Sequence, residues 1–255
     1  MPDRSRRASM WKGDSVLTPS RGRARTVATV LAGVLTALSL TACGGDSDGG
    51  GGSDAAPEDV FAAAKTNLDE TSGVNLTLST DKLPDGVTGV EKAEGVGTHA
   101  PAFEGSITVV LSGQAFEVPV VAVDDKVYVQ LPLTTGYQDI DPAEYGAPDP
   151  AQLMSTDAGF SALLPATTDV EKGESVRGGA DNKEVLTEYS GSVPGDVVKN
   201  VIPTASGDFD VTYTITDDDE LRSAELTGVF YKDSDPMTYV VTFEDYGTEK
   251  DITAP

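Results

Sequence analysis

The sequence contains 255 residues, with 42 acidic and 18 basic side chains, one cysteine (Cys43) and one histidine (His99). The net charge of −24 excludes nucleic-acid binding, because proteins hold a phosphate backbone through clustered lysine and arginine side chains. A single cysteine cannot form an internal disulfide, and a single histidine removes most Ser-His-Asp triads and His-rich metal sites. We therefore expect a protein that is not an enzyme and that has no catalytic residues, no metal site and no cofactor.

The N-terminal region has the three-part layout of a signal peptide. Arg21, Arg23 and Arg25 form a basic flank, and an apolar run of about 14 residues extends from Val27 to Leu40. A helix needs roughly 20 residues to span the hydrocarbon core of a membrane, so this run is too short for a permanent transmembrane helix. The basic flank favours export of everything that follows.

Leu40-Thr41-Ala42-Cys43 resembles the bacterial lipobox. This resemblance implies cleavage between Ala42 and Cys43 and attachment of a diacylglyceryl group to the Cys43 thiol. The other interpretation is a chance apolar segment that ends in a buried cysteine. The arginines before Met10 lie far from the apolar run. Met10 is therefore an alternative to Met1 as the start of translation.

These features predict three segments: a signal peptide at 1–42, a lipidated cysteine with a flexible glycine-rich linker at 43–55, and one domain at 56–255. After removal of residues 1–42, 11 basic and 40 acidic residues remain, a net charge of −29. An anionic leaflet repels so acidic a domain. Attachment to the membrane must therefore come from the lipid itself. We expect the protein on the extracytoplasmic face of the cell membrane.

Apolar residues at helical spacing predict that the domain begins with a helix at 56–70, with Asp54 as its cap and Pro57 in its first turn. Alternating apolar residues then predict a strand at 74–78, whereas 82–97 has the composition of a loop. Further strands are expected at 107–111, 116–120 and 127–131, which form an antiparallel meander. We expect irregular chain over 132–148.

The second half of the domain opens with a broken helix or two short helices over 149–164, ended by Pro165. A short helix is expected at 194–201, and the remaining strands are expected at 170–176, 184–193, 209–216, 221–231 and 237–246. Runs of strands with few helices indicate an α+β fold with one large antiparallel sheet and helices on one face.

Three local motifs have simpler interpretations than a functional site. The acidic run 217–220 lacks the spacing of a calcium loop and is typical of a solvated hairpin turn. Asn75-Leu76-Thr77 matches a glycosylation triplet but lies within a predicted strand. His99, two residues before Pro101, is expected in a loop.

Several strands are apolar on both faces, above all the run Val120-Val121-Ala122-Val123. Such a sheet is either covered on both sides by ordinary core packing or encloses a ligand. Composition does not decide between these two possibilities.

The domain resembles the actinobacterial LppX/LprAFG lipoprotein family. The resemblance rests on the lipobox, the acidic mature domain and several short segments in the same order, namely 72–78, 121–129, 149–154 and 157–164. It implies a large antiparallel half-barrel sheet with helices packed on its concave face, enclosing an apolar cavity that accepts acyl chains. It also implies that the protein binds and transfers multi-acyl lipids or glycolipids in the cell envelope, in some members beside a major-facilitator transporter.

Strand alternation within this fold gives a set of apolar residues expected to face the cavity: Leu76, Leu78, Val109, Leu111, Val118, Val120, Val127, Val129 and Leu131. Acyl lipid is then cargo, and the partner is a membrane lipid or glycolipid. An alternative function is an envelope interaction or signalling module whose concave face binds a protein segment. An enzyme that acts on the envelope is a further alternative, which would need a buried pair of carboxylates.

Overall fold

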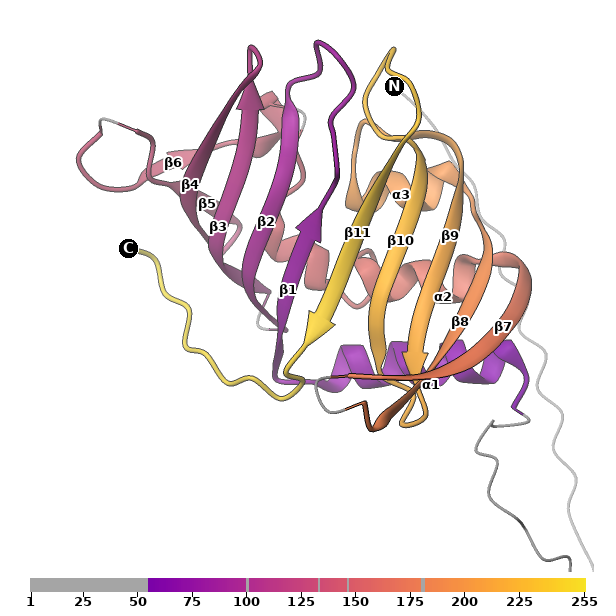
Figure 1. Cartoon of the computed structure of the whole chain (residues 1–255). Helices are drawn as coiled ribbons and strands as arrows, with labels where there is room; N and C mark the ends of the chain where they lie inside the picture. The colour runs from indigo at the N-terminus through magenta and orange to yellow at the C-terminus, as the bar shows by residue number, and fades with distance from the viewer. Residues whose placement is uncertain (1–54, 100, 133, 146, 180–181) are drawn as a thin grey trace, which may run out of the picture. The chain divides into compact units, whose positions relative to one another are not determined.

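The computed structural model describes residues 55–255, apart from 100, 133, 146 and 180–181 (Figure 1). The chain divides into two units, Met1–Asp48 and Gly49–Pro255, and all described residues belong to the second. The predicted signal peptide, Cys43 and Asp54 lie outside the described residues. In the described part of the chain, no helix is both long and apolar enough to cross a membrane.

The unit contains short helices and a large set of strands. The helices are α1 (Pro57–Glu70), α2 (Leu163–Ala166) and α3 (Gly195–Val201), with 3₁₀ helices η1 (Pro142–Tyr145), η2 (Pro150–Met154) and η3 (Phe160–Ala162). The strands are β1 (Gly73–Ser79), β2 (Gly89–Thr98), β3 (Ala102–Leu111), β4 (Gln114–Val123), β5 (Lys126–Val129), β6 (Gln138–Ile140), β7 (Thr168–Gly178), β8 (Glu184–Val193), β9 (Ser206–Thr216), β10 (Leu221–Val229) and β11 (Met237–Glu244).

All these strands form one antiparallel sheet in the order β6-β5-β4-β3-β2-β1-β11-β10-β9-β8-β7. The sheet is two consecutive meanders, β1–β6 and β7–β11, joined where the first strand pairs with the last. In that central pair, Leu76 lies opposite Phe243. The predicted α+β class with one large antiparallel sheet is confirmed.

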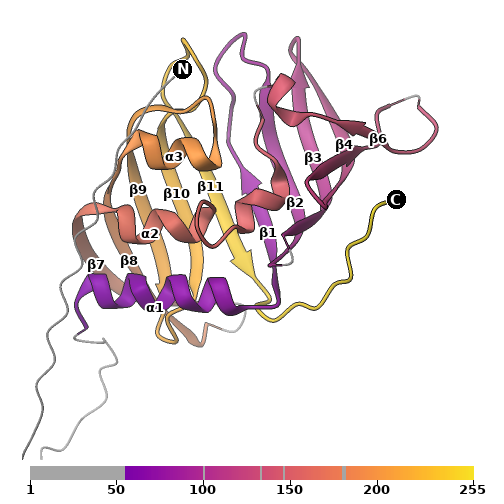
Figure 2. The same ribbon diagram turned by 180° about the vertical axis from the view of Figure 1, so that it is seen from behind.

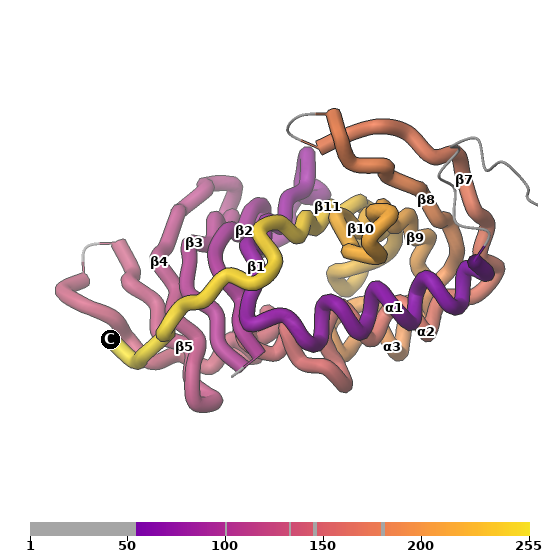
Figure 3. The backbone as a smooth tube through the Cα atoms, turned by 90° about the horizontal axis from the view of Figure 1, so that it is seen from below, coloured from indigo at the N-terminus to yellow at the C-terminus, as the bar shows by residue number. Residues whose placement is uncertain are grey.

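The helices lie on one face of the sheet, as the view from behind shows (Figure 2). Seen from below, the sheet bends over them in the predicted half-barrel (Figure 3). Helix α1 begins as expected, with Pro57 in its first turn, although the cap is Ala56, which makes no side-chain hydrogen bond. Its apolar stripe of Val60, Phe61, Ala64 and Leu68 is buried against the concave face.

The prediction of a loop over 82–97 was wrong for its second half, which forms β2. Two of its glycines, Gly95 and Gly97, lie where a Cβ would have no room. A Cβ on Gly97 would lie 2.6 Å from Cγ of Met154 in η2, and one on Gly105, in the neighbouring β3, would lie 2.0 Å from the Glu94 carbonyl oxygen. Glycine here lets η2 and the next strand approach closely, and this removes the apolar alternation by which a strand is recognised.

Two smaller expectations also need correction. The segment 132–148, expected to be irregular, contains β6 and η1. Pro165 does not stop the helix before it but lies inside α2, which ends one residue later at Ala166. Proline is tolerated in the first turn of a helix, where its missing N–H has no intrahelical partner to lose.

Replacement of Gly105 by alanine should destabilise the fold by about 2–3 kcal/mol, because the new Cβ meets backbone that cannot move aside. Urea unfolding of the unit Gly49–Pro255 followed by circular dichroism measures this change. Ser106→Ala, on the adjacent half-buried position, is the control and should remain near wild type. Equal stability of both variants would contradict the close packing of β2 on β3.

Candidate functional site

Two apolar cavities lie next to each other on the concave face, the larger under β2–β5 and the smaller under β1–β3, from which it reaches β11 and α3. The larger has a volume of about 320 Å³ and the smaller about 100 Å³. Both are lined by Ala147, Pro148 and Pro150, from the segment that crosses from β6 towards β7. Proline has no backbone N–H, so this crossing segment places fewer unpaired donors against apolar space.

All nine residues expected to face a cavity from strand alternation lie in the walls of these two. Leu76 and Leu78 line the smaller cavity. The larger is lined by the other seven, which are Val109, Leu111, Val118, Val120, Val127, Val129 and Leu131. Strands β1 and β3–β5 therefore turn the expected faces towards the cavities, since a shift of one residue would have turned them outwards.

Several lining residues were not found from the sequence. Ile107 lies one step before Val109 in the β3 alternation, within the predicted strand, and Phe103 lies three steps before it, beyond the start of that strand. Val90 was hidden in the glycine-rich segment assigned to a loop, and Ile140 in the segment assigned as irregular. Pro148 and Pro150 carry no pattern that separates a cavity lining from an ordinary turn.

Polar side chains are scarce in the lining. Thr88 is the polar side chain that borders the larger cavity, and Tyr231 and Tyr239 border the smaller. The Val90 N–H donates to Tyr231 Oη at 3.1 Å, the two phenol oxygens lie 2.7 Å apart, and Tyr239 Oη donates to the Val90 carbonyl. Burial raises the pKa of Tyr239, so this phenol remains neutral. The network satisfies both hydroxyls and leaves an apolar interior.

The other half of the concave face, under β8–β11, is filled by aromatic side chains. Phe61 from α1 packs edge-on against Tyr189 and Tyr213, with ring centroids 5.5 and 5.3 Å apart. Phe230 packs in the same manner between Phe209 and Tyr239. The concave face is thus solid on one side and hollow on the other.

One end of the hollow half is open. Leu111, at the end of β3, is 43% exposed, and Leu131, just after β5, is 39% exposed, although both line the larger cavity. Leu111 pairs with Gln114 in the hairpin between β3 and β4. That hairpin lies at the upper end of the sheet in Figure 1, which makes this end the mouth of the cavity.

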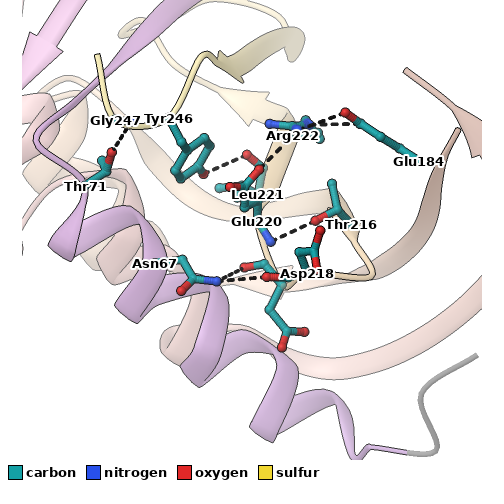
Figure 4. Close-up of polar contacts among 11 residues, drawn as sticks. Asn67, Thr71, Glu184, Thr216, Asp218, Glu220, Leu221, Arg222, Tyr246 and Gly247 are labelled. Carbon is teal, nitrogen blue, oxygen red and sulfur yellow. Dashed lines mark hydrogen bonds and ion pairs between the residues drawn. The ribbon is translucent and has the colours of Figure 1, made fainter. Parts of the chain in front are cut away.

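The opposite end of the sheet is tied to α1 by polar contacts (Figure 4). The Asn67 side-chain amide donates to the backbone carbonyls of Asp218 and Asp219, at 3.1 and 2.8 Å. Arg222 makes two hydrogen bonds to Glu184, at 3.0 and 3.1 Å, and these bonds lower the pKa of that carboxyl. The acidic turn therefore binds α1 through its backbone carbonyls, whereas Arg222 joins β10 to β8.

The outer face of β3 and β4 is covered by the C-terminal segment, seen from below in Figure 3. Ile252 packs there with Ala102, Val121 and Val123 in a small second core. The two-sided apolar pattern of β4 thus has a different cause on each face. Val120 lines the cavity, whereas Val121 lies under Ile252.

Asp149 fixes the start of the crossing segment's helix. Its Oδ1 accepts a hydrogen bond from the Ala151 N–H at 2.9 Å, which caps η2. Burial raises the pKa of the Asp149 carboxyl above its usual value of 3.8, and nearby Asp125 adds to this effect. Because Pro150 follows Asp149 directly and lines both cavities, this cap helps to position their shared wall.

The remaining sequence motifs lie away from the cavities. His99 is in the turn after β2, as expected, and its Nε2 lies 2.6 Å from the Leu68 carbonyl oxygen of α1. Asn75 lies within β1, as expected, and its side-chain amide donates to Asp245 at 2.6 Å. Among the residues that the structure describes, no group of three or more His, Cys, Asp or Glu side chains has metal-binding geometry.

The sheet and its hollow half define the class of half-barrel proteins that enclose an apolar cavity. The sequence profile of the LppX_LprAFG lipoprotein family matches residues 56–254, so the chain belongs to this family, as its resemblance predicted. No curated protein sequence matches the chain.

Two solved structures show the same fold. LprF from Mycobacterium bovis superposes with a TM-score of 0.63 at 15% identity, covering 78% of this chain and 96% of LprF. LppX from Mycobacterium tuberculosis superposes with a TM-score of 0.57 at 16% identity, covering 79% of this chain and 100% of LppX.

Two substitutions at Asp149 should separate its cap from its charge. Asp149→Ala removes the cap and should cost about 1 kcal/mol of stability, whereas asparagine still accepts the hydrogen bond. Because the folded state has the raised pKa, it binds more protons, so the wild type loses stability as the pH rises through and above 3.8. Asp149→Asn lacks this loss, and its stability relative to wild type should rise between pH 3.5 and pH 7 in urea titrations. A constant difference would contradict the burial of the charge.

Proposed function

We propose that this protein is a membrane-anchored lipoprotein that binds multi-acyl lipids or glycolipids and transfers them in the cell envelope. The observation that carries the proposal is the hollow half of the concave face, which is apolar in its lining and open at one end. Burial of acyl chains gains about 0.8 kcal/mol per CH₂ group, so a dry cavity can extract a lipid without a catalytic group.

The two cavities together hold about 420 Å³, so binding of a lipid with more than one chain requires the site to widen. The larger cavity alone lies at the small end of the roughly 300–1,000 Å³ typical of ligand sites. The two cavities share the lining residues Gly89, Val90, Ile107, Ala147, Pro148 and Pro150. A small movement of the 147–150 segment would join them into one groove.

The anchor forms the second part of the proposal. Lipid on Cys43 would tether the domain to the extracytoplasmic face of the membrane, with residues 43–55 as a flexible leash. The acidic domain is repelled by anionic headgroups, so the tether keeps the cavity near its source of lipid. On the family resemblance alone, we also propose that a major-facilitator transporter is the partner that supplies or receives the lipid.

Replacement of Val129 by tryptophan should reduce the bound lipid severalfold, because Val129 is 5% exposed and its side chain lines the larger cavity. Protein produced in its own host and analysed by native mass spectrometry shows the lipid that co-purifies. Leu111→Trp, at the partly exposed mouth, repeats the test at a position where a larger side chain is tolerated.

Val176→Trp is the matched control, because Val176 is 55% exposed on β7, away from both cavities. It should carry as much lipid as wild type. Wild-type protein that carries no lipid would contradict the proposed function. Unchanged loading in both cavity variants, with the fold intact by circular dichroism, would place the lipid elsewhere.

The anchor is tested by metabolic labelling with radioactive palmitate. Wild-type protein should incorporate the label and partition with the membrane, whereas Cys43→Ala should do neither, because the thiol is the acceptor of the lipid. Label that persists in the Cys43→Ala variant would disprove anchoring at this residue.

A further inference from the structure

Three exposed apolar side chains gather at the mouth of the larger cavity. In the described part of the chain, the most exposed large apolar side chains are Leu111, Leu131, Tyr137 and Val176. Leu111 and Leu131 line the mouth. Tyr137 is 38% exposed and directly precedes Gln138, which pairs with Val129 of β5, so it lies at the base of the loop that begins at Leu131. The fourth, Val176, is on β7 at the far edge of the sheet.

The two segments that carry the three side chains at the mouth contain no charged residue. One is 105–116, from β3 through the hairpin into β4, and the other is 127–138, from β5 through the loop to the start of β6. Charged residues make up 24% of the sequence, so each segment of 12 residues would ordinarily contain about three. Glu117, the next residue of β4, alternates with the buried Val118 and so faces the outer side of the sheet. The mouth is therefore bordered by two uncharged segments.

The strand pairing leaves this corner of the sheet open. Strand β5 pairs with β4 only from Val120 to Val123. The Gln130 N–H then donates to the Pro119 carbonyl at 3.0 Å, and the chain turns away at Leu131. Among the strands that the structure describes, none lies beside residues 114–118 of β4 on this side. The exposed apolar side chains border this gap.

The neighbouring loops at the same end of the sheet are charged. Figure 1 shows the β1–β2 and β10–β11 loops beside the β3–β4 hairpin. Their charged residues are Asp81, Lys82, Asp85, Lys232, Asp233 and Asp235. The mature domain as a whole has a net charge of −29, so an anionic leaflet repels it. The uncharged corner combines the weakest local repulsion with the greatest apolar exposure, which suits contact with a membrane.

We propose that this corner is a membrane-contact surface, on which Leu111, Leu131 and Tyr137 rest on the lipid leaflet around the mouth of the cavity. This inference rests on the proposed lipid-binding function and adds the surface by which the protein meets its source of lipid. Acyl chains then pass between leaflet and cavity without exposure to water. Tyrosine suits such a surface, because its apolar ring and polar hydroxyl favour the boundary between membrane and water.

The tether is long enough to permit this contact. Helix α1, which follows the tether, runs along the lower end of the sheet in Figure 1, opposite the β3–β4 hairpin. Strands β3 and β4, of ten residues each, are about 33 Å long. A linker over residues 43–55 spans up to about 45 Å when it is extended. Lipid on Cys43 can therefore remain in the leaflet while the mouth rests on it.

Tryptophan fluorescence tests the contact directly, because the one tryptophan of the sequence, Trp11, lies in the predicted signal peptide. The mature chain 43–255 is coupled through its single cysteine to a maleimide lipid in phosphatidylcholine vesicles with brominated acyl chains, which quench tryptophan at contact. The Tyr137→Trp variant should be quenched about threefold more strongly than Val176→Trp, the matched control at the far edge of the sheet. Residue 137 is outside the lining of both cavities, so it reports on the leaflet.

Added charge tests the surface in the Tyr137→Trp background. Gln114 is exposed on the hairpin outside the cavity lining, and glutamate has the same shape. One charge at an anionic surface changes a binding constant about fivefold, so Gln114→Glu should weaken contact by this factor on vesicles that also contain phosphatidylglycerol. Asn182→Asp adds the same charge in the exposed β7–β8 turn. It should leave the quenching unchanged, because salt screens charges beyond about 10 Å.

The outcomes separate this inference from the proposed function. Untethered protein that is loaded with the brominated lipid and freed of vesicles measures quenching by cavity-bound lipid, which is subtracted. Loading without further quenching in vesicles would overturn the contact surface and leave lipid binding intact. Quenching in vesicles by protein that loads no lipid would support the surface and contradict the proposed function.

Two other results would also overturn the inference. Equal quenching of the Tyr137→Trp and Val176→Trp variants would mean that the tether alone brings both near the leaflet. A dimer in sedimentation, with the tryptophan of Tyr137→Trp already shielded from water before vesicles are added, would assign the surface to a second copy of the chain.

Discussion

The concave face of the sheet must be covered along its whole width, and the chain covers its two halves in different ways. Under β8–β11, helix α1 and a set of edge-on aromatic rings fill the space with protein. Under β1–β5, the cover is the thin crossing segment 147–154, and two cavities remain beneath it. The packed half supplies stability, because burial of large aromatic side chains is the strongest apolar contribution to a core. The hollow half is therefore free to be shaped for a ligand.

Close backbone approach makes this thin cover possible. Gly97 leaves room for Met154 of η2, and Gly95 lies opposite Gly105 where the neighbouring strands leave no space for a Cβ. Asp149 then sets the direction in which the crossing segment leaves the cavity wall. A side chain at Gly97, or loss of the Asp149 cap, would displace η2. Either change would alter the cavity before it altered the sheet. Substitutions at these positions thus test the architecture of the site as well as the stability of the fold.

The sequence predicted the architecture best where the alternation of side chains directly reflects which face of a strand is buried. The alternation in β3–β5 located the wall of the larger cavity, because one face of those strands is truly apolar. It failed at β2, where glycines serve close packing and remove the pattern. It also could not show which apolar face was hollow, since Val120 and Phe209 have the same local sequence signal but one borders space and the other borders Phe230. The cover supplied by Ile252 depends on a contact between distant segments that no local pattern records.

The pairing of the first strand with the last has a consequence for the order of assembly. Leu76 and Phe243 lie opposite each other but 167 residues apart in the chain. Strand β1 pairs on one edge with its sequence neighbour β2, a local contact, and on the other edge with β11. Closing the sheet between β1 and β11 therefore needs a long-range contact of the kind that slows folding.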